Sequence, residues 1–203
     1  GVAGSLSFSE LLRPHAAAGE LERLVRYAEL LERWSRRHNL VSYRDRDELV
    51  HRHLVDALAG RELLVGSGCL LDVGSGAGLP GVPLLLSRPA WRGVLLEPRQ
   101  KRWAFLRLVV RELGLDATVE RVRYQDYRHG GAAFDLVTMR GLGRHAELIG
   151  WAASRLATDG RVLLWSTEED EAVLRRLPGW RVLSSPLPSL TRGRLVQLRP
   201  CFT

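Results

Sequence analysis

Four closely spaced glycines mark the segment of this sequence that is best suited to binding a ligand. The segment runs from Leu70 to Gly81 as Leu-Leu-Asp-Val-Gly-Ser-Gly-Ala-Gly-Leu-Pro-Gly. Glycine lets a backbone adopt positive φ angles and approach a ligand closely, and the N–H groups at the start of a following helix are free to bind it. Ligands of doubly wound α/β sheets bind at the carboxyl ends of such strands. The segment therefore predicts a ligand-binding loop between a strand and a helix.

The acids beside this loop help to decide whether it binds a dinucleotide or another nucleoside-containing ligand. Gly76, Gly78 and Gly81 have the spacing of a dinucleotide-binding loop, and Glu97 follows where an acid would bind ribose hydroxyls. Against a dehydrogenase, the Asp72 carboxylate would repel a pyrophosphate, and too little chain follows for a separate substrate domain. A carboxylate instead suits a ligand with a positive centre and an ammonium group. S-adenosylmethionine has both, so it is the expected ligand, with a dehydrogenase as a distant alternative.

The first 66 residues have the pattern of a helical cap. Between residues 20 and 38, apolar residues recur at the spacing of one buried helix face. A second helix is predicted to begin at Asp45, because Asp45 and Glu48 have the spacing of a capping box, and to end at Gly60 or Gly66. We therefore expect residues 1–66 to form a helical unit that precedes the glycine loop.

From Gly68 onward, short apolar runs alternate with helical patterns. The predicted strands are Cys69–Val73, Gly93–Glu97, Ala117–Val122, Phe134–Met139 and Arg161–Trp165, and the predicted helices are Pro80–Ser87, Arg99–Leu113, Arg144–Leu156 and Glu168–Leu177. Such an alternation is typical of a parallel sheet covered on both faces. Trp180–Ser184 and Arg194–Leu198 are joined by a connection too short for a helix, so we expect an antiparallel pair at the sheet edge. The predicted fold is α/β: a doubly wound, mostly parallel sheet with antiparallel C-terminal edge strands, formed by residues 67–203 and preceded by the cap.

The positive charge of the chain is unevenly distributed. Basic residues outnumber acidic ones by 30 to 23, which gives a net charge of +7, and Lys101 is the only lysine. Residues 1–66 hold ten basic and ten acidic side chains, so the whole excess lies in residues 67–203. Arginine makes planar, bidentate contacts with phosphate, so this excess favours a nucleic-acid partner. A genome rich in G and C is the alternative explanation for the arginines.

Composition disfavours several other classes of protein and site. A chain with 45% hydrophobic and 26% charged residues is typical of one soluble globular domain, with or without a small appendage. Cys69 and Cys201 show no metal-ligand spacing, so we expect free thiols in a reducing cytoplasm and no metal. No apolar run reaches the roughly 18 residues that cross a bilayer. We therefore expect a cytoplasmic monomer without membrane contact.

A family resemblance rests on the glycine loop and on residues to both sides of it. The stretch from Asp72 to Gly78 resembles motif I of the class I S-adenosylmethionine-dependent methyltransferases, and Glu97 resembles the acid that ends their second strand. A more specific match is carried by Asn39-Leu40, Arg44-Asp45, His53, Asp56, Leu79-Pro80-Gly81-Val82-Pro83, Lys101-Arg102 and Phe105-Leu106. Over roughly residues 20 to 165, the chain is similar to the bacterial 16S ribosomal RNA guanine-N7 methyltransferase family, RsmG or GidB. The resemblance implies a class I methyltransferase with S-adenosyl-L-methionine as cofactor and 16S rRNA, or the small ribosomal subunit, as partner.

The resemblance also implies a set of site residues. By position, the cofactor residues are Asp72, Gly74, Gly76, Gly78, Leu79, Glu97, Tyr124, Gln125 and Arg140, and Asp126 is a candidate partner of the adenine amino group. Three segments depart from the family pattern: Tyr124-Gln125 replaces a small-acidic pair, Met139-Arg140-Gly141 replaces Ser-Arg-Ala, and Trp165-Ser166 replaces Lys-Gly. The last of these concerns a proposed RNA or substrate contact. Cofactor binding is therefore better supported than the identity of the substrate.

Methylation of guanine N7 needs positioning rather than a base, because N7 has a free lone pair and no proton at neutral pH. We expect Arg140 to be the catalytic residue, in contact with the guanine or a phosphate. The alternative for Arg140 is a structural ion pair, for example with Asp135. Two other functions stay open: a related methyltransferase that acts on another RNA or a small molecule, and a protein that binds S-adenosylmethionine without catalysis.

Residues of the cap and of the basic segment are candidates for substrate binding. His53 and Asp56 share one helix face at i, i+3 spacing, which fits either an internal hydrogen bond that docks the helix or a place in the site. The resemblance favours the site, because the helical segment lies over the cofactor pocket in that family. The expected substrate residues are Asn39, His53, Lys101, Arg102 and Arg123, although Asn39 could equally cap the first long helix.

Overall fold

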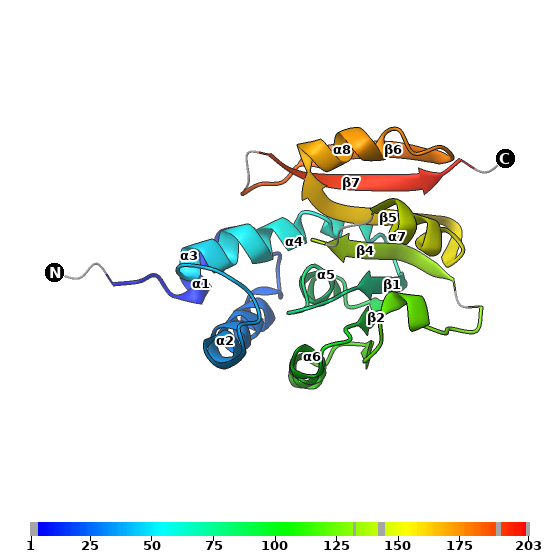
Figure 1. Ribbon diagram of the computed structural model, residues 1–203. Helices are drawn as coiled ribbons and strands as arrows, with labels where there is room; N and C mark the ends of the chain where they lie inside the picture. Colours follow the sequence, from blue (N-terminus) through cyan, green and yellow to red (C-terminus); the bar gives the residue numbers. More distant parts are fainter. Residues whose placement is uncertain (1–3, 132, 142–144, 190–191, 202–203) are drawn as a thin grey trace.

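A seven-stranded sheet forms the centre of the computed structural model, which describes residues 4–131, 133–141, 145–189 and 192–201 (Figure 1). The strands are β1 (Gly68–Val73), β2 (Trp91–Leu96), β3 (Ala117–Glu120), β4 (Phe134–Arg140), β5 (Leu156–Thr167), β6 (Trp180–Pro186) and β7 (Gly193–Pro200). Their order in the sheet is β3-β2-β1-β4-β5-β7-β6. Strands β1 to β5 pair in parallel, whereas β7 pairs antiparallel with both β5 and β6. The predicted fold class and the antiparallel edge are both confirmed.

Helices cover both faces of the sheet. On one face, α5 (Gly81–Ser87) and α6 (Gln100–Leu113) share a hydrophobic core with the cap; on the other, a second core contains residues of α7 (His145–Ala153) and α8 (Glu168–Leu174). Strand β1 serves both cores, since Leu70 belongs to the first and Leu71 to the second. This is why the strand is apolar at successive positions. The predicted start of α7 at Arg144 lies outside the described residues.

The cap is helical, with one irregularity at its centre. It comprises α1 (Phe8–Leu12), α2 (Leu21–His38), α3 (Arg46–Glu48), a π-helical segment (Leu49–Val55) and α4 (Asp56–Leu58), with single 3-10 turns at Arg13–His15 and Arg61–Leu63. The prediction of a regular helix after Asp45 is therefore wrong over the π-helical part. The Asp45 side chain does accept the Glu48 N–H at 2.9 Å, but the Glu48 carboxylate binds the N–H of Arg44 rather than that of Asp45. The start of this helix was predictable, but its π-helical turns were not.

Two predicted boundaries differ from the structure in the sheet region. β5 begins at Leu156, five residues before its predicted start, and pairs there with Phe134. The register of this pair shifts between Phe134 and Leu136, and Asp159 has a φ of 64°. This irregular backbone hides the early part of the strand from an analysis of apolar runs. In contrast, α8 ends at Leu174, three residues earlier than predicted.

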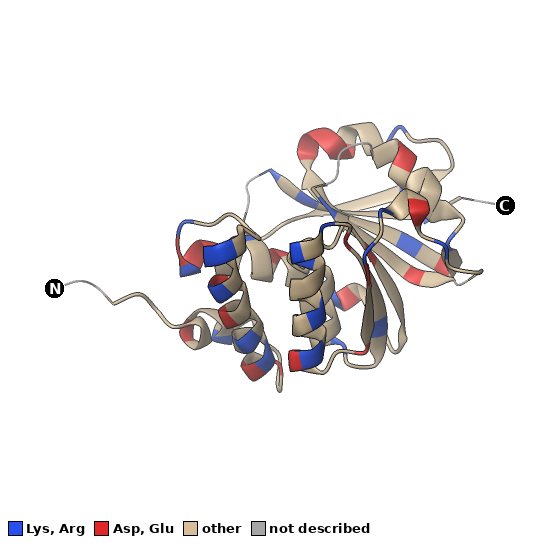
Figure 2. Cartoon of the chain, turned by 60° about the horizontal axis from the view of Figure 1, so that its bottom comes forward, with Lys and Arg blue, Asp and Glu red and all other residues tan. Residues whose placement is uncertain are grey.

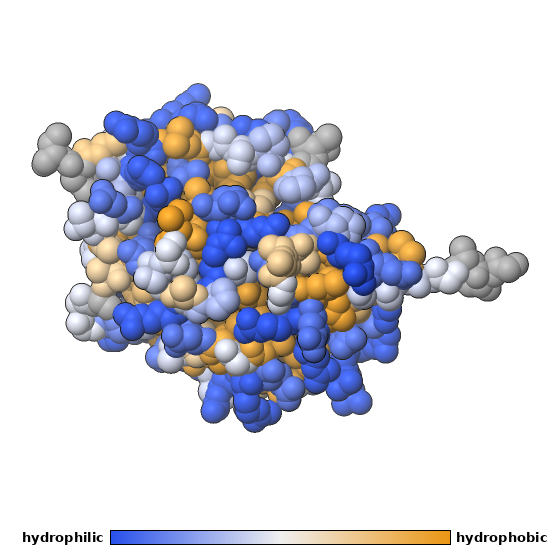
Figure 3. Space-filling view, turned by 180° about the vertical axis from the view of Figure 1, so that it is seen from behind, coloured by the Kyte–Doolittle hydropathy of each residue, from blue (hydrophilic) through white to orange (hydrophobic). Residues whose placement is uncertain are grey.

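The surface of the molecule is mainly hydrophilic. Seen from behind, apolar residues appear in groups between charged ones (Figure 3). The large apolar side chains that are exposed include Leu6, Val65, Val173 and Leu183, which lie in separate parts of the chain. Among the described residues, no helix combines the length and the apolar character needed to cross a membrane.

Candidate functional site

The glycine loop follows β1 at the carboxyl edge of the sheet. Gly74, Gly76 and Gly78 have φ angles of 63°, 59° and 96°, which side chains other than glycine rarely adopt. Gly78 is also constrained by packing, because a Cβ there would lie 2.6 Å from Cγ2 of Val82 and 3.0 Å from the Tyr27 hydroxyl. At Gly76 the nearest such atom is the Gly74 carbonyl oxygen at 3.8 Å, an ordinary van der Waals contact, so this position is less tightly packed. The loop thus has a packed side at Gly78 and a more open side at Gly76.

Asp72 lies beneath this loop rather than in its open side. Its carboxylate accepts hydrogen bonds from Ser75 Oγ at 2.6 Å and Thr138 Oγ1 at 2.7 Å, and the Gly81 N–H also donates to it. The side chain is fully buried, and burial raises its pKa to about 6. We expected this carboxylate to meet an ammonium group directly, but the geometry uses it as an internal anchor of the loop. The correction arises because Thr138, on the neighbouring strand β4, completes the enclosure.

Glu97 lies against the glycine loop as a buried side chain, with 3% of its surface exposed. It directly follows β2, and one carboxylate oxygen accepts the Gly76 N–H at 3.2 Å while the other accepts the Arg99 N–H at 3.3 Å. The Ser75 N–H donates to the Leu96 carbonyl at 2.8 Å, which ties the loop to the end of β2. The structure therefore brings Glu97 to the glycine loop, as the spacing of the two motifs predicts.

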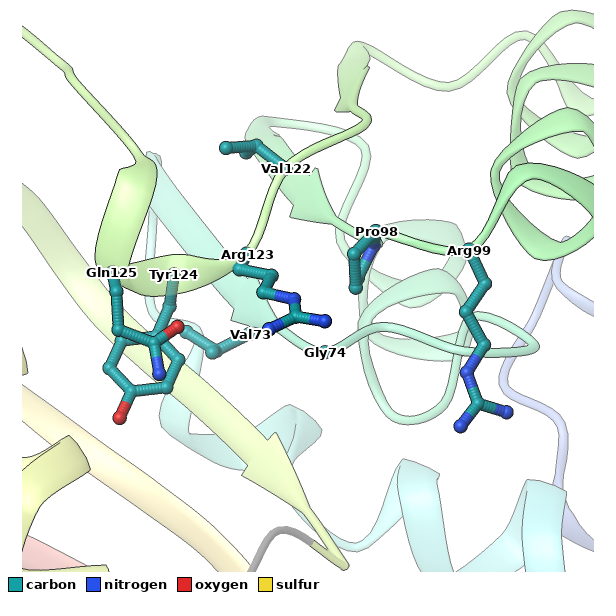
Figure 4. A pocket seen from close by; sticks show the side chains of 8 residues that line it. All are labelled: Val73, Gly74, Pro98, Arg99, Val122, Arg123, Tyr124 and Gln125. Atoms are coloured by element: carbon teal, nitrogen blue, oxygen red, sulfur yellow. The ribbon is translucent and has the colours of Figure 1, made fainter.

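A cavity of about 450 Å³ opens at this edge of the sheet (Figure 4). Its lining residues come from the ends of β1 and β2 and from the turn after β3: Val73, Gly74, Pro98, Arg99, Val122, Arg123, Tyr124 and Gln125. In the close view, the guanidinium groups of Arg99 and Arg123 lie on the same side of the strand ends as Gly74 (Figure 4). Three predicted cofactor residues, Gly74, Tyr124 and Gln125, are in the wall. Leu79 is buried in the core instead, and Asp126 is exposed outside the wall.

The unusual Tyr124-Gln125 pair lies on a short 3-10 turn, Tyr124–Asp126. The Tyr124 hydroxyl donates to Glu147 of α7 at 2.9 Å, and its ring meets Trp151 edge to face with the ring centroids 5.2 Å apart. The tyrosine thus joins the turn to α7 and forms one wall of the cavity. The Gln125 side chain is exposed at the cavity and carries amide donor and acceptor atoms.

Arg140 ends β4 beside the glycine loop, because its neighbour Met139 pairs with Val73 of β1. Its guanidinium lies 3.1 Å from Nδ1 of His53, a residue of the cap. Burial lowers the pKa of Arg140, while the nearby Tyr27, Asp72 and Asp56 act in the opposite direction. The alternative of an ion pair with Asp135 is wrong: Asp135 lies at the start of β4 and accepts the Cys69 N–H at 2.8 Å.

His53 and Asp56 have different partners. Nε2 of His53 lies 2.9 Å from the Ser42 carbonyl, and burial, aided by the charge of Arg140, lowers the pKa of His53 to about 4. Asp56 accepts hydrogen bonds from the N–H and hydroxyl of Ser189 at 3.0 and 2.5 Å. Asp56 therefore docks the cap against the C-terminal part of the chain, and His53 reaches the carboxyl edge of β4.

The four remaining candidates are a helix cap and three basic residues. Asn39 adopts a left-handed conformation with a φ of 53° and caps α2, as the alternative for this residue predicted. Arg123 lines the cavity, whereas Lys101 and Arg102 lie on the first turn of α6, outside the cavity wall. Lys101 and Arg102 thus follow the carboxyl end of β2, and Arg123 follows that of β3.

The Trp165-Ser166 segment at the end of β5 is committed to internal contacts. The indole Nε1 of Trp165 donates to the Asp56 carbonyl at 2.7 Å, and its ring packs where a Cβ at Gly60 would lie only 2.8 Å away. The Ser166 hydroxyl donates to Asp170 at 2.7 Å. In this chain, Trp165 is an anchor for the cap.

Tyr27 is the residue of this region that the sequence analysis missed. It is fully buried on α2, and its hydroxyl donates to the Ala77 carbonyl in the glycine loop at 2.6 Å. The available signal was a tyrosine on the apolar face of a predicted helix, since a buried tyrosine hydroxyl normally has a hydrogen-bond partner. Through Tyr27 the cap holds the packed side of the loop. Within the described ranges, no group of three or more His, Cys, Asp or Glu side chains is arranged to hold a metal ion.

Solved structures share this architecture at low sequence identity. The cofactor-bound protein Rv0187 from MTB superposes with a TM-score of 0.65 and 16% identity over 93% of this chain and 94% of that one. A methyltransferase from Geobacter sulfurreducens gives a TM-score of 0.63 at 14% identity over 98% and 100% of the two chains. The ribosomal protein L11 methylase from Lactobacillus delbrueckii subsp. bulgaricus gives 0.61 at 18% identity over 74% and 79%. These similarities establish the class I methyltransferase fold.

Sequence comparison identifies the family. The chain is 42% identical over 161 residues to the ribosomal RNA small subunit methyltransferase G of Alkalilimnicola ehrlichii, covering 79% of this chain and 72% of that protein. It is 38% identical to the protein of the same name from Xanthomonas campestris pv. campestris, over 78% and 75% of the two chains. The GidB family model, described as rRNA small subunit methyltransferase G, matches residues 20–178. This chain therefore belongs to the rRNA small subunit methyltransferase G family.

Proposed function

We propose that this protein binds S-adenosylmethionine at the carboxyl edge of β1 and β2 and transfers its methyl group to N7 of a guanine in 16S ribosomal RNA. The observation that carries the proposal is the meeting of three elements at one edge. The open side of the glycine loop, the Glu97 carboxylate and the Arg140 guanidinium come from the ends of β1, β2 and β4, in a chain that belongs to an rRNA methyltransferase family.

The residues at this edge fit the proposed cofactor. A cavity of about 450 Å³ falls in the range of roughly 300–1,000 Å³ that is usual for small-molecule sites. Glu97 would accept the two ribose hydroxyls, Gln125 and the backbone of the Tyr124 turn would bind the adenine edge, and Gly74 and Gly76 would let the ligand approach the loop. When bound, S-adenosylmethionine supplies a methyl group on a positively charged sulfur.

Arg140 is suited to bind an anionic group. It is largely enclosed, yet no described carboxylate forms an ion pair with it within 4 Å. The two nearest carboxylates, of Asp72 and Asp56, are engaged by hydroxyl and backbone donors. A guanidinium held in this way has its charge available for a carboxylate or a phosphate. We assign it either the carboxylate of the cofactor or a phosphate of the RNA.

The chemistry at the acceptor base requires orientation and little else from the protein. Guanine N7 attacks with its own lone pair, so no side chain has to remove a proton. The base becomes positively charged as the new bond forms, so a cation directly at N7 would oppose the reaction. A guanidinium would therefore help when it contacts an acceptor oxygen, such as a phosphate oxygen or O6 of the guanine. The exposed basic residues Lys101, Arg102 and Arg123 would hold the RNA backbone at the rim.

Mass-spectrometric mapping of methylated guanines tests the proposal. The purified protein is incubated with S-adenosylmethionine and either 16S rRNA or small ribosomal subunits from cells that lack the gene. We expect one guanine to gain a methyl group at N7, and we expect Glu97→Gln to lower cofactor affinity at least tenfold, because it removes a charged acceptor. Exposed Glu62→Gln is the matched control. Absence of any methylated guanine in both substrates would overturn the rRNA assignment.

A further inference from the structure

One polar side chain of the cap reaches Arg140, although the two are 87 residues apart. It is His53, which is 7% exposed and lies in the π-helical segment Leu49–Val55. π-Helical turns are rare and are frequently found at functional sites. In this segment they place the imidazole between the carbonyl of Ser42 and the guanidinium of Arg140, with distances of 2.9 and 3.1 Å.

These two contacts assign the proton of the imidazole. An arginine side chain has only donors, so Nδ1 of His53 must offer its lone pair to Arg140. The Ser42 carbonyl is an acceptor, so Nε2 must carry the hydrogen and donate it. A protonated imidazole would present a second N–H to the guanidinium and break the first contact. The geometry therefore requires one neutral tautomer, with hydrogen on Nε2.

The neutral state is also favoured by the charges that surround His53. Burial and the charge of Arg140, with a smaller contribution from Arg52, lower the pKa of His53 to about 4, although the hydrogen bond to the Ser42 carbonyl and the charge of Glu48 act in the opposite direction. His53 consequently stays uncharged across the range in which a cell works. Its contact with Arg140 persists over that range.

A neutral acceptor acts on Arg140 differently from a carboxylate. A carboxylate would orient the guanidinium and also neutralise it, which would weaken its attraction for a ligand anion. An imidazole orients the guanidinium and leaves its full charge. The helix that carries His53 is itself fixed, because Trp165 donates to the Asp56 carbonyl and Ser189 donates to the Asp56 carboxylate. The cap thereby offers Arg140 a rigid, uncharged support.

We propose that His53 is a positioning residue that holds the Arg140 guanidinium ready for an anionic group of the cofactor or the RNA. The proposal rests on the proposed function only in naming these two ligands. It gives the helical cap a role in the site, because His53 of the cap orients the guanidinium of Arg140 at the end of β4. It also replaces our expectation that His53 contacts the substrate itself.

The test uses substitutions that separate the two contacts of the imidazole. In His53→Asn, the amide oxygen occupies the place of Nδ1 and still accepts from Arg140. In His53→Gln, the amide reaches the place of Nε2 and keeps the Ser42 contact but loses Arg140. His51→Asn, on the same segment, is the control. Thermal unfolding of each variant shows whether the fold is retained.

Two ligands and the RNA then identify the anion that Arg140 meets. S-adenosylhomocysteine contains the amino-acid carboxylate, whereas 5′-methylthioadenosine lacks it and keeps the adenosine. If Arg140 binds this carboxylate, His53→Gln and Arg140→Gln lower affinity for the first ligand about tenfold and leave the second unchanged. If Arg140 binds an RNA phosphate, the same variants raise the KM for RNA about tenfold instead. In either case His53→Asn stays near wild type. The double variant with His53→Gln and Arg140→Gln loses no more affinity than Arg140→Gln alone.

The outcomes that would overturn the positioning role are distinct from failure of the methyltransferase assignment. Wild-type levels of ligand binding and RNA KM in His53→Gln would overturn it, and so would equal losses in the Asn and Gln variants. Imidazole ¹⁵N NMR adds a readout that needs neither ligand nor activity. We expect the Nε2–H tautomer of His53 without titration above pH 5, and a raised pKa in Arg140→Gln. A charged imidazole at pH 6 in the wild type would refute the proposal even if rRNA methylation were demonstrated.

Discussion

The cap and the segment that follows β2 use their arginines in different ways. In the cap, Arg44 and Arg52 pair with Glu48, Arg36 and Arg46 pair with Glu32, and Arg61 pairs with Glu20. Figure 2 shows acidic and basic positions interspersed along these helices. Residues 99–128 hold eight basic side chains against four acids, and none of the eight forms an ion pair with a described residue. The cap thus pairs many of its arginines with its own acids, whereas the basic side chains of the second segment have no such ion pairs.

This difference answers the question raised by the arginine excess. A bias in genome composition accounts for the choice of arginine over lysine in both regions. It does not account for acids that accompany the arginines in one region and are scarce in the other. Two members of the unpaired group, Arg99 and Arg123, line the cavity. The contrast therefore supports the proposal that RNA phosphates meet this edge.

The largest effect is expected from reversing charge in the unpaired group. The triple variant Lys101→Glu, Arg102→Glu and Arg123→Glu should weaken RNA binding about 100-fold at 0.15 M salt and reduce the slope of log K against log salt by about 2 to 3. The same change at Arg26, Arg36 and Arg44 of the cap, each of which forms an ion pair, should have a much smaller effect. Filter binding or fluorescence anisotropy across a salt series measures both. Equal losses of RNA affinity in the two triple variants would show that the two regions do not differ in RNA binding.

A buried cap pair should matter next, for stability rather than for RNA. Arg61 donates to Glu20 at 3.0 Å and to the His15 carbonyl at 3.0 Å, and the Glu20 side chain is almost fully buried. Arg61→Gln should cost about 2–3 kcal/mol in the free energy of unfolding, because it leaves a buried carboxylate without its cation. Arg175→Gln should cost less than about 1 kcal/mol, because Arg175 is half-exposed and Glu171 keeps its second ion pair, with Arg194. Urea unfolding of the two variants compares them; a larger loss in the second would contradict this ranking.

The cap and the sheet contain acids whose pKa values shift in opposite directions, Glu48 in the cap and Asp72 on β1. Burial raises the pKa of Asp72 from 3.8 to about 6, so stability should fall by up to about 3 kcal/mol as pH rises from 4 to above 6. Hydrogen bonds from Arg44 lower the pKa of Glu48 from 4.5 to about 2, so its contribution is present above pH 4.5 and lost as pH falls towards 2. Denaturant unfolding across this range should lose the first trend in Asp72→Asn and the second in Glu48→Gln. An unchanged pH profile in Asp72→Asn would show that the carboxyl titrates normally.

The smallest effect tests the link between the cap and the loop. Tyr27→Phe removes the hydrogen bond to the Ala77 carbonyl and leaves a buried acceptor unpaired. We expect a loss of about 1–2 kcal/mol, which corresponds to a few degrees in Tm, and a severalfold loss of affinity for S-adenosylhomocysteine. Tyr43→Phe, at a half-buried position of the cap, is the control. A loss of stability without any change in affinity would show that the Tyr27 hydrogen bond does not influence ligand binding at the loop.

Much of the fold could be predicted because its signals are local. The apolar spacing of Leu21–His38 predicts a helix that the structure contains with nearly the same ends. The closely spaced glycines after an apolar strand predict the loop. In the cap, Asp45 predicts the start of the helix that follows α2. α1 was not resolved as a separate helix within the predicted helical cap, although Ser7 and Glu10 form a capping box there. At five residues, it is too short to show helical periodicity.

The roles of single polar residues depended on partners far away in the chain. Asp72 has the spacing of a ligand-binding acid, and it is Thr138, 66 residues later, that helps to turn it into a loop anchor. Trp165 replaces a proposed RNA contact, and its indole instead holds the Asp56 carbonyl, 109 residues earlier. No local pattern reports such pairs, because they form only when the strands and the cap are packed.

The sequence by itself determined the elements, the glycine loop, the family and the uneven charge, since each depends on the types and spacing of nearby residues. The tertiary structure decided which polar groups are enclosed and which remain open. It buried Asp72 and Glu97, left Gln125 exposed at the cavity and placed His53 against Arg140. The physical reason is that the state of a charge is set by its desolvation and its partners, and both are supplied by segments that only folding brings together.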